Sequence, residues 1–225
     1  MARRFSQSEN RHRLPYPLFT IPILRMYHIY TTEAIVIGSA PRGETSMMVR
    51  LLTPEMGLIY AHAQAIRAPQ AKLRAALQDF TYTRADLVRG KGGWRVIGAR
   101  ALAGMTPLFR DEARREAGGL AARLALLVRR LVRGEAPNEA LFYELMRAYA
   151  LLREGTAGTS PETLASFEAL VVMRMLRSLG YWADDAAFQP FITAECLDDK
   201  LLDTAHTIRP RAIAEINRVL GAIQL

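Results

Sequence analysis

Cysteine is almost missing from this chain, which has only Cys196 among its 225 residues. A lone cysteine cannot form a disulfide within the chain, and it excludes a structural zinc site of the usual cysteine-rich kind from a single copy. Long apolar runs are missing too, because no stretch reaches the ~18 residues that a membrane span needs. These absences predict a protein of the reducing cytoplasm that holds no metal and does not cross a membrane.

Groups that could carry out catalysis are few as well. The two acidic pairs, 184–185 and 198–199, lack the spaced ligands and the glycine of a calcium loop. The glycine-rich run at 90–93 lacks the Gly-Lys-Ser/Thr ending of a phosphate loop. None of the four histidines stands in a recognisable nucleophile or metal motif; they are His12, His28, His62 and His206. We therefore predict that the protein is not an enzyme and needs no cofactor.

Positive charge is in excess, and it is unevenly distributed. The whole chain has 30 Lys and Arg against 22 Asp and Glu, a net charge of +8. Residues 1–100 hold 15 basic and 6 acidic side chains, whereas residues 101–225 hold 15 and 16. Such asymmetry favours an anionic partner for the basic half, although basic charge also serves solubility alone.

Residues 1–30 have the composition of an extension rather than of a folded domain. They are rich in arginine and then in proline, and they show neither helical nor strand periodicity. A more regular stretch begins at Met26, and one hypothesis is that the natural protein starts there. We expect the first domain to occupy residues 31–104.

Residues 31–104 have the pattern of a small β-barrel. Runs rich in β-branched and apolar residues are separated by turns that contain Pro or Gly. A short helix is expected at 67–77, between the third and fourth strands. Five short strands with a helix in that position are typical of an OB-type barrel, a partly open Greek-key barrel whose face binds oligonucleotides. The expected strands are 33–39, 45–53, 58–66, 79–88 and 94–102.

Residues 105–225 have helical periodicity, so the predicted fold class is α+β: an N-terminal five-stranded OB-type barrel followed by an all-helical domain. The helix over 160–179 is apolar nearly all round and is predicted to be the central, buried one. Residues 181–208 are predicted to be irregular and acidic, and Pro210 to stand near the start of the last helix. The expected helices are 110–133, 138–154, 160–179 and 210–222.

The basic residues of the predicted barrel fall in its turns and beside its short helix. In an OB barrel the turns and one face border a single groove, where Lys and Arg neutralise phosphates and give salt-sensitive binding. Aromatic side chains in such a groove stack on the bases of a single strand, and the candidates are Tyr60, Phe80, Tyr82 and Trp94. The alternative is a basic barrel whose aromatics belong to its core. The predicted nucleic-acid-binding residues are Arg42, Arg67, Lys72, Arg74, Arg89, Lys91 and Arg95.

Five short motifs follow one another through the barrel region. They are Gly43-Glu44-Thr45-Ser46, Leu52-Thr53-Pro54-Glu55-Met56-Gly57, Lys72-Leu73-Arg74, Leu77-Gln78-Asp79-Phe80 and Arg89-Gly90-Lys91-Gly92-Gly93. In order and spacing this set resembles the bacterial RecO family of DNA repair proteins, which are recombination mediators. The resemblance implies binding of single- and double-stranded DNA and annealing of complementary strands. It also implies loading of recombinase onto strands coated by single-strand-binding protein.

The resemblance further implies two protein partners and a nucleoid-associated place in the cytoplasm. One partner is a RecR-type protein. The other is single-strand-binding protein, whose acidic, hydrophobic tail would contact the helical domain; candidates from charge are Arg123, Arg129, Arg130 and Arg133. Two departures from the family matter. Gln64-Ala65 stands where a lysine-glycine pair is frequent, and the region of a four-cysteine zinc module, 181–208, has only Cys196, so zinc is not expected.

Two other classes of function fit the same charge and strand pattern. One is an RNA-binding or ribosome-associated OB-fold protein, which competition between matched DNA and RNA oligonucleotides would distinguish. The other is an adaptor whose helical domain binds proteins while the barrel is mainly structural. A pull-down with single-strand-binding protein would identify the adaptor, provided that DNA binding proved dispensable.

Overall fold

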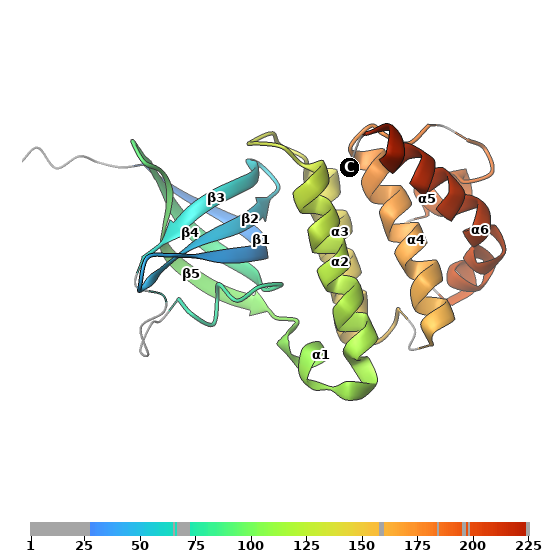
Figure 1. Ribbon diagram of the computed structural model, residues 1–225, viewed down its shortest axis with the longest axis horizontal. Coiled ribbons are helices and arrows are strands. Elements are labelled where there is room, and N and C mark those ends of the chain that lie inside the picture. Colours follow the sequence, from blue (N-terminus) through green and yellow to red (C-terminus); the bar gives the residue numbers. More distant parts are fainter. Residues whose placement is uncertain are drawn as a thin grey trace, which may run out of the picture.

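A β-barrel and a set of helices lie side by side along the long axis of the molecule (Figure 1). The computed structural model describes residues 28–64, 66, 73–157, 160–183, 185–194, 197 and 199–223. Residues 1–27 of the expected extension lie outside the described residues. Helices α2 and α3 stand between the barrel and the remaining long helices, α4 and α6.

The barrel is closed and has five strands in the order β1-β2-β3-β5-β4. Four of its strand pairs are antiparallel, and β3 pairs with β5 in parallel. The long first strand pairs with β4 through its first half and with β2 through its second half, which closes the sheet on itself. This topology confirms the predicted OB-type barrel. The strands are β1 (Ile29–Arg42), β2 (Ser46–Thr53), β3 (Gly57–Ala63), β4 (Tyr82–Gly90) and β5 (Gly93–Ala103).

The segment between β3 and β4 closes one end of the barrel interior, because Leu77 packs into the same buried cluster as Val36 and Ile59. A helix was expected at 67–77. Its described part, 73–77, is a turn with one helix-like hydrogen bond, from the Leu77 amide to the Leu73 carbonyl at 3.0 Å. The prediction is therefore wrong for these residues, while 67–72 lie outside the described residues. The chain turns back to β1 at once, with the Phe80 amide donating to Val36 at 2.7 Å.

The chain after the barrel is helical, as predicted. The Asn138 side chain caps α3 and that of Ser160 caps α4, each accepting a hydrogen bond from an amide three residues on. Helix α4 is buried along most of its length, which confirms it as the central helix. The helices are α1 (Thr106–Arg110), the 3₁₀ helix η1 (Glu112–Arg114), α2 (Arg115–Leu131), α3 (Glu139–Glu154), α4 (Pro161–Ser178), α5 (Gln189–Thr193) and α6 (Asp199–Ala222).

The last helix differs from its predicted form. Helix α6 begins at Asp199 rather than near residue 210, and Pro210 lies inside it. Buried residues continue at helical spacing on both sides of the proline, from Leu202 to Val219, and they belong to the same core as α4. Burial of this stripe outweighs the hydrogen bond that a proline removes from the helix.

The outer surface of the barrel packs against the helices in a hydrophobic cluster that is separate from the barrel interior. Ile35, Ile37, Leu52 and Leu58 of the barrel's outer surface are buried in the same cluster as the apolar side chains of α2, α3 and α4. The turn after β2 also makes a close backbone contact with the α2–α3 loop. A Cβ atom on Gly57, whose φ is +67°, would stand 2.1 Å from the Ala136 carbonyl oxygen, so glycine is required there.

Candidate nucleic-acid interface

The outer face of β2 and β3 has two environments along its length. At one end, the cross-strand pair Leu52 and Leu58 is buried under the helices. Two residues further along, Arg50 pairs with Tyr60, and two further still Met48 pairs with His62. Because alternate residues of a strand point to the same side, these side chains form one surface that begins where the helices end.

Arg50 and Tyr60 form the centre of this surface. The Arg50 guanidinium lies 5.8 Å from the centre of the Tyr60 ring, within the range of a cation–π contact. Tyr60 is 49% exposed, so its ring offers a face to solvent beside a positive charge. That combination suits a single strand, which places a base on an aromatic ring and a phosphate beside a cation.

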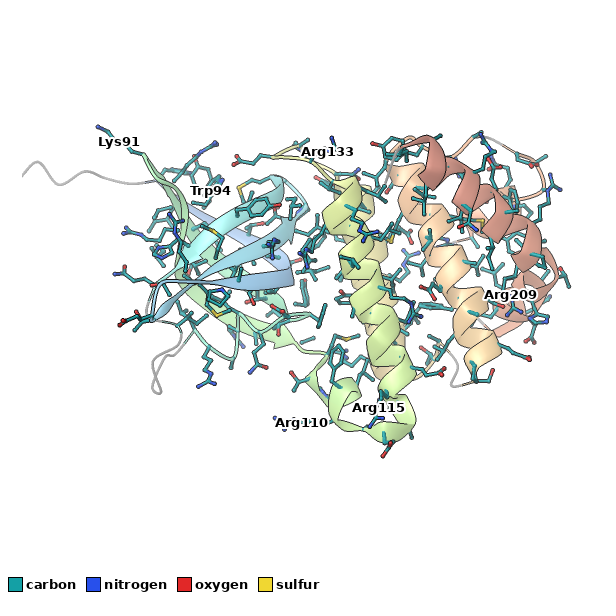
Figure 2. All side chains as sticks on the ribbon, in the orientation of Figure 1. Lys91, Trp94, Arg110, Arg115, Arg133 and Arg209 are labelled. Atoms are coloured by element: carbon teal, nitrogen blue, oxygen red, sulfur yellow. The ribbon has the colours of Figure 1, made fainter. Side chains whose placement is uncertain are left out.

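The same surface continues onto β5 and the β4–β5 hairpin. His62 pairs with Arg95 across the parallel β3–β5 ladder. A shallow pocket of about 210 Å³ lies next to this pair, between His62, Arg95 and the glycines at 90, 92 and 93. Figure 2 shows Lys91 projecting at the hairpin tip, away from the helices. The hairpin therefore adds two exposed cations, Lys91 and Arg95, to the barrel face.

Arg89 has protein partners that the sequence does not reveal. Its guanidinium lies 5.2 Å from the centre of the Trp94 ring and forms an ion pair of 3.1 Å with Glu135 of the α2–α3 loop. The side chains of Arg89 and Glu135 are 58% and 38% exposed. Arg89 therefore joins the hairpin to the helices, and a phosphate would compete with Glu135 for it.

Five of the seven predicted binding residues lie in the described part of the chain. Arg42 ends β1 beside the β1–β2 turn, Arg74 lies in the β3–β4 segment, and Arg89, Lys91 and Arg95 belong to the β4–β5 hairpin or its strands. All five are exposed. The other two, Arg67 and Lys72, lie outside the described residues. The assignment of all seven to nucleic-acid binding stays a prediction.

The four candidate aromatics have different surroundings. Trp94 is 5% exposed and belongs to the barrel core. Phe80 packs on Phe109 of α1, with 5.2 Å between ring centres. Tyr82 lies near Phe142 of α3, and burial, followed by a hydrogen bond to Glu33, raises its pKa to about 12. Tyr60 is the one of the four that stands exposed on the barrel face.

Comparison with known proteins agrees with this architecture. The family profile described as "Recombination protein O N terminal" matches residues 26–100, which contain the barrel through most of β5. The proteins named DNA repair protein RecO from a Dehalococcoides mccartyi strain and from an Anaeromyxobacter dehalogenans strain are 30% and 34% identical to the chain, over 155 and 137 residues. Residues 26–100 of the chain belong to the RecO N-terminal family.

These alignments cover 68% and 60% of this chain. A third RecO protein, from Gloeothece citriformis, is 28% identical over 179 residues, or 80% of the chain. The same alignments cover 57%, 52% and 60% of the three relatives. The chain thus spans little more than half the length of the curated relatives it matches.

The sequence did not identify three residues of the candidate interface. Arg50 and His62 lie on the barrel face, and Arg129 reaches it from α2. Arg50 stands in an apolar run that predicts a strand, and its pairing with Tyr60 depends on strand register. A polar residue at every second position, as in Tyr60 and His62, was the available signal. The sequence makes Arg129 a candidate contact for the tail of single-strand-binding protein, whereas in the structure its guanidinium lies over Gly38 of β1.

The described residues contain neither a cluster of metal ligands nor a helix that could span a membrane. No group of three or more His, Cys, Asp or Glu there is placed to hold a metal ion; Cys196 lies outside the described residues. No helix among the described residues combines the length and apolar character that crossing a membrane requires.

Proposed function

We propose that this chain is a non-enzymatic DNA-binding protein of DNA repair, which anneals complementary strands and helps to load recombinase onto single strands coated by single-strand-binding protein. The observation that carries the proposal is the pairing of Arg50 with exposed Tyr60 on the outer β2–β3 face of a five-stranded barrel. The β2–β3 face is where OB folds bind oligonucleotides. The name DNA repair protein RecO of the relatives supports the same role.

In this proposal, the DNA contacts the barrel face and the turns that border it. The proposed phosphate contacts are Arg42, Arg67, Lys72, Arg74, Arg89, Lys91 and Arg95. Phosphate contacts of this kind position a strand without reading its sequence, which suits a protein that anneals any complementary pair. The proposed division of the chain is a DNA-binding domain at 31–104 and a helical domain at 105–225.

The proposed site for the tail of single-strand-binding protein is a groove in the helical domain. An apolar hollow of about 390 Å³ lies between α2, α4 and α6, and it contains Leu126 and Ile213, each 43% exposed. Arg123 and Arg130 border it. Arg123 already donates two hydrogen bonds to Glu168, at 2.8 and 2.7 Å. An acidic, hydrophobic tail would therefore place apolar side chains in the hollow and a carboxylate near Arg130. The second proposed partner is a RecR-type protein. The proposed location of the complex is the cytoplasm, in association with the nucleoid.

Strand annealing tests this function directly. We expect the protein to accelerate the annealing of two complementary labelled oligonucleotides, both bare and coated with single-strand-binding protein. Binding to a labelled oligonucleotide should weaken steeply as salt increases, because phosphate contacts release counterions. Absence of binding at low salt, or a flat dependence on salt, would contradict the proposal. Stronger competition by matched RNA than by DNA would favour the RNA-binding alternative.

A further inference from the structure

Two guanidinium groups, one from the barrel and one from the helical part, meet over the backbone of Gly38. A Cβ atom on Gly38 would stand 3.3 Å from Nη1 of Arg129 and 3.6 Å from Nη1 of Arg50. Gly38 lies at a bulge of β1 with φ of +149° and pairs with Arg50 of β2. The missing side chain leaves a space that both guanidinium groups border.

Neither cation is neutralised by a carboxylate among the described residues. Two positive groups placed close together repel each other, and an anion between them removes that repulsion. Guanidinium groups also match the geometry of phosphate, since each presents several N–H donors in a fixed plane.

The position of Arg129 on its helix does not by itself account for this arrangement. Arg129 belongs to the last turn of α2, where a cation is stabilised by the negative end of the helix dipole. Its guanidinium, however, lies against β1, with Cδ 3.7 Å and Nη1 3.3 Å from the Cβ position of Gly38. The side chain therefore extends from the helix to the barrel.

We propose that Arg50 and Arg129 together bind a single backbone phosphate of a nucleic-acid strand while the neighbouring base stacks on Tyr60. This inference rests on the proposed function and adds a named contact that spans the barrel and α2. Arg50 is suited to both tasks, because it lies over the Tyr60 ring as well as beside Gly38. The bound strand would then leave the open barrel face at its junction with α2.

The test is a double-mutant cycle in the full chain, with binding of fluorescent oligothymidine measured at several salt concentrations. The variants are Arg50→Gln, Arg129→Gln and both together. Arg115→Gln is the matched control, because it removes one exposed charge from the same helix; Figure 2 shows Arg115 at the opposite end of α2 from Arg133. Thermal unfolding verifies that each variant is folded.

We expect each single substitution to weaken binding at low salt by about five-fold, as loss of a phosphate contact does. The fold-loss of affinity in the double variant should be smaller than the product of the two single fold-losses, because both side chains hold the same phosphate. The double variant's slope of log affinity against log salt should become shallower by about 0.7, the value for one phosphate of a single strand. Arg115→Gln should leave affinity and slope nearly unchanged.

Other results would overturn the inference. If the two single effects multiply and the slope changes by about 1.4, the arginines bind two separate phosphates. If both variants behave like Arg115→Gln while the wild type binds with a steep salt dependence, neither arginine contacts the strand, and the proposed function stands without this site. If the wild type does not bind at low salt, the proposed function fails together with the inference.

Discussion

Arg89 of the β4–β5 hairpin and Glu135 of the α2–α3 loop form an ion pair of 3.1 Å between the barrel and the helices. The sequence predicts that Arg89 binds DNA, whereas in the structure its charge is paired with Glu135. We therefore expect Glu135→Gln to strengthen DNA binding by about two- to five-fold at low salt, because an exposed ion pair of this kind contributes up to about 1 kcal/mol. Anisotropy titration with a labelled oligonucleotide measures the change.

Glu139→Gln is the control for Glu135, since it removes a nearby negative charge from the first turn of α3. If both substitutions strengthen binding equally, the effect comes from net charge and not from release of Arg89. Unchanged binding by Glu135→Gln would show that Arg89 makes no phosphate contact.

Tyr60→Ala should weaken binding of single-stranded DNA while it leaves the protein folded and nearly as stable. The ring is 49% exposed, so its removal leaves no buried cavity, whereas loss of one base stack costs about 1–3 kcal/mol. Tyr60→Phe keeps the stacking surface and should bind almost as the wild type does. Tyr143→Ala, at 45% exposure on α3, is the matched control. Equal losses from Tyr60→Ala and Tyr143→Ala would argue against a stacking role.

Trp94→Ala should act in the opposite way and destabilise the barrel. Trp94 is buried among Val96, Leu87 and the other side chains of the barrel core, and removal of such a ring costs about 3–5 kcal/mol through lost contacts and a cavity. Urea unfolding followed by circular dichroism measures the loss. A stable Trp94→Ala variant with impaired DNA binding would instead assign the ring to the DNA.

High pH should destabilise the barrel–helix junction through Tyr82. Burial, followed by the hydrogen bond and charge of Glu33, raises the pKa of Tyr82 from its ordinary 10.0 to about 12. The neutral phenol is therefore favoured in the folded state, and its contribution to stability is complete below pH 10 and lost as pH rises towards 12. Thermal unfolding across this range should fall more for the wild type than for Tyr82→Phe. Parallel declines would mean that Tyr82 is not responsible.

Ile213→Glu should abolish binding of the acidic tail of single-strand-binding protein if the groove between α2, α4 and α6 receives it. The substitution places a carboxylate in the apolar hollow, where it repels an acidic peptide. Ile97→Glu is the matched control, because Ile97 is 44% exposed on β5. Calorimetric titration with the tail peptide should show a loss for Ile213→Glu alone; equal binding by both variants would place the tail elsewhere.

Much of the fold follows from local patterns in the sequence. Alternating apolar residues and Pro- or Gly-containing turns predict five strands, and helical periodicity predicts the helices over 138–154 and 160–179, which the structure shows capped by Asn138 and Ser160. The prediction fails where tertiary packing overrides local preference. Pro210 indicates a helix start on its own, yet it lies inside α6 because apolar residues on both sides of it are buried against α4.

The candidate site was only partly predictable, for a physical reason. Exposed cations in turns, such as Lys91, can be identified from the chain because turns lie at the surface. The pairing of Arg50 with Tyr60 depends on the register of β2 and β3, and the approach of Arg129 to Gly38 depends on how α2 packs against the barrel. No local pattern in the sequence encodes this register or this packing.

By itself, the sequence determined that the basic excess falls in the N-terminal part, that the barrel is of the OB type, and which turns bear exposed cations. Only the tertiary structure decided that Trp94 is core, that Arg89 has Glu135 as a partner, and that Arg50 and Arg129 meet. Strand and helix periods are local properties, fixed by which residues follow one another. Contacts between side chains far apart in the chain exist only once the barrel has closed and the helices have packed against it.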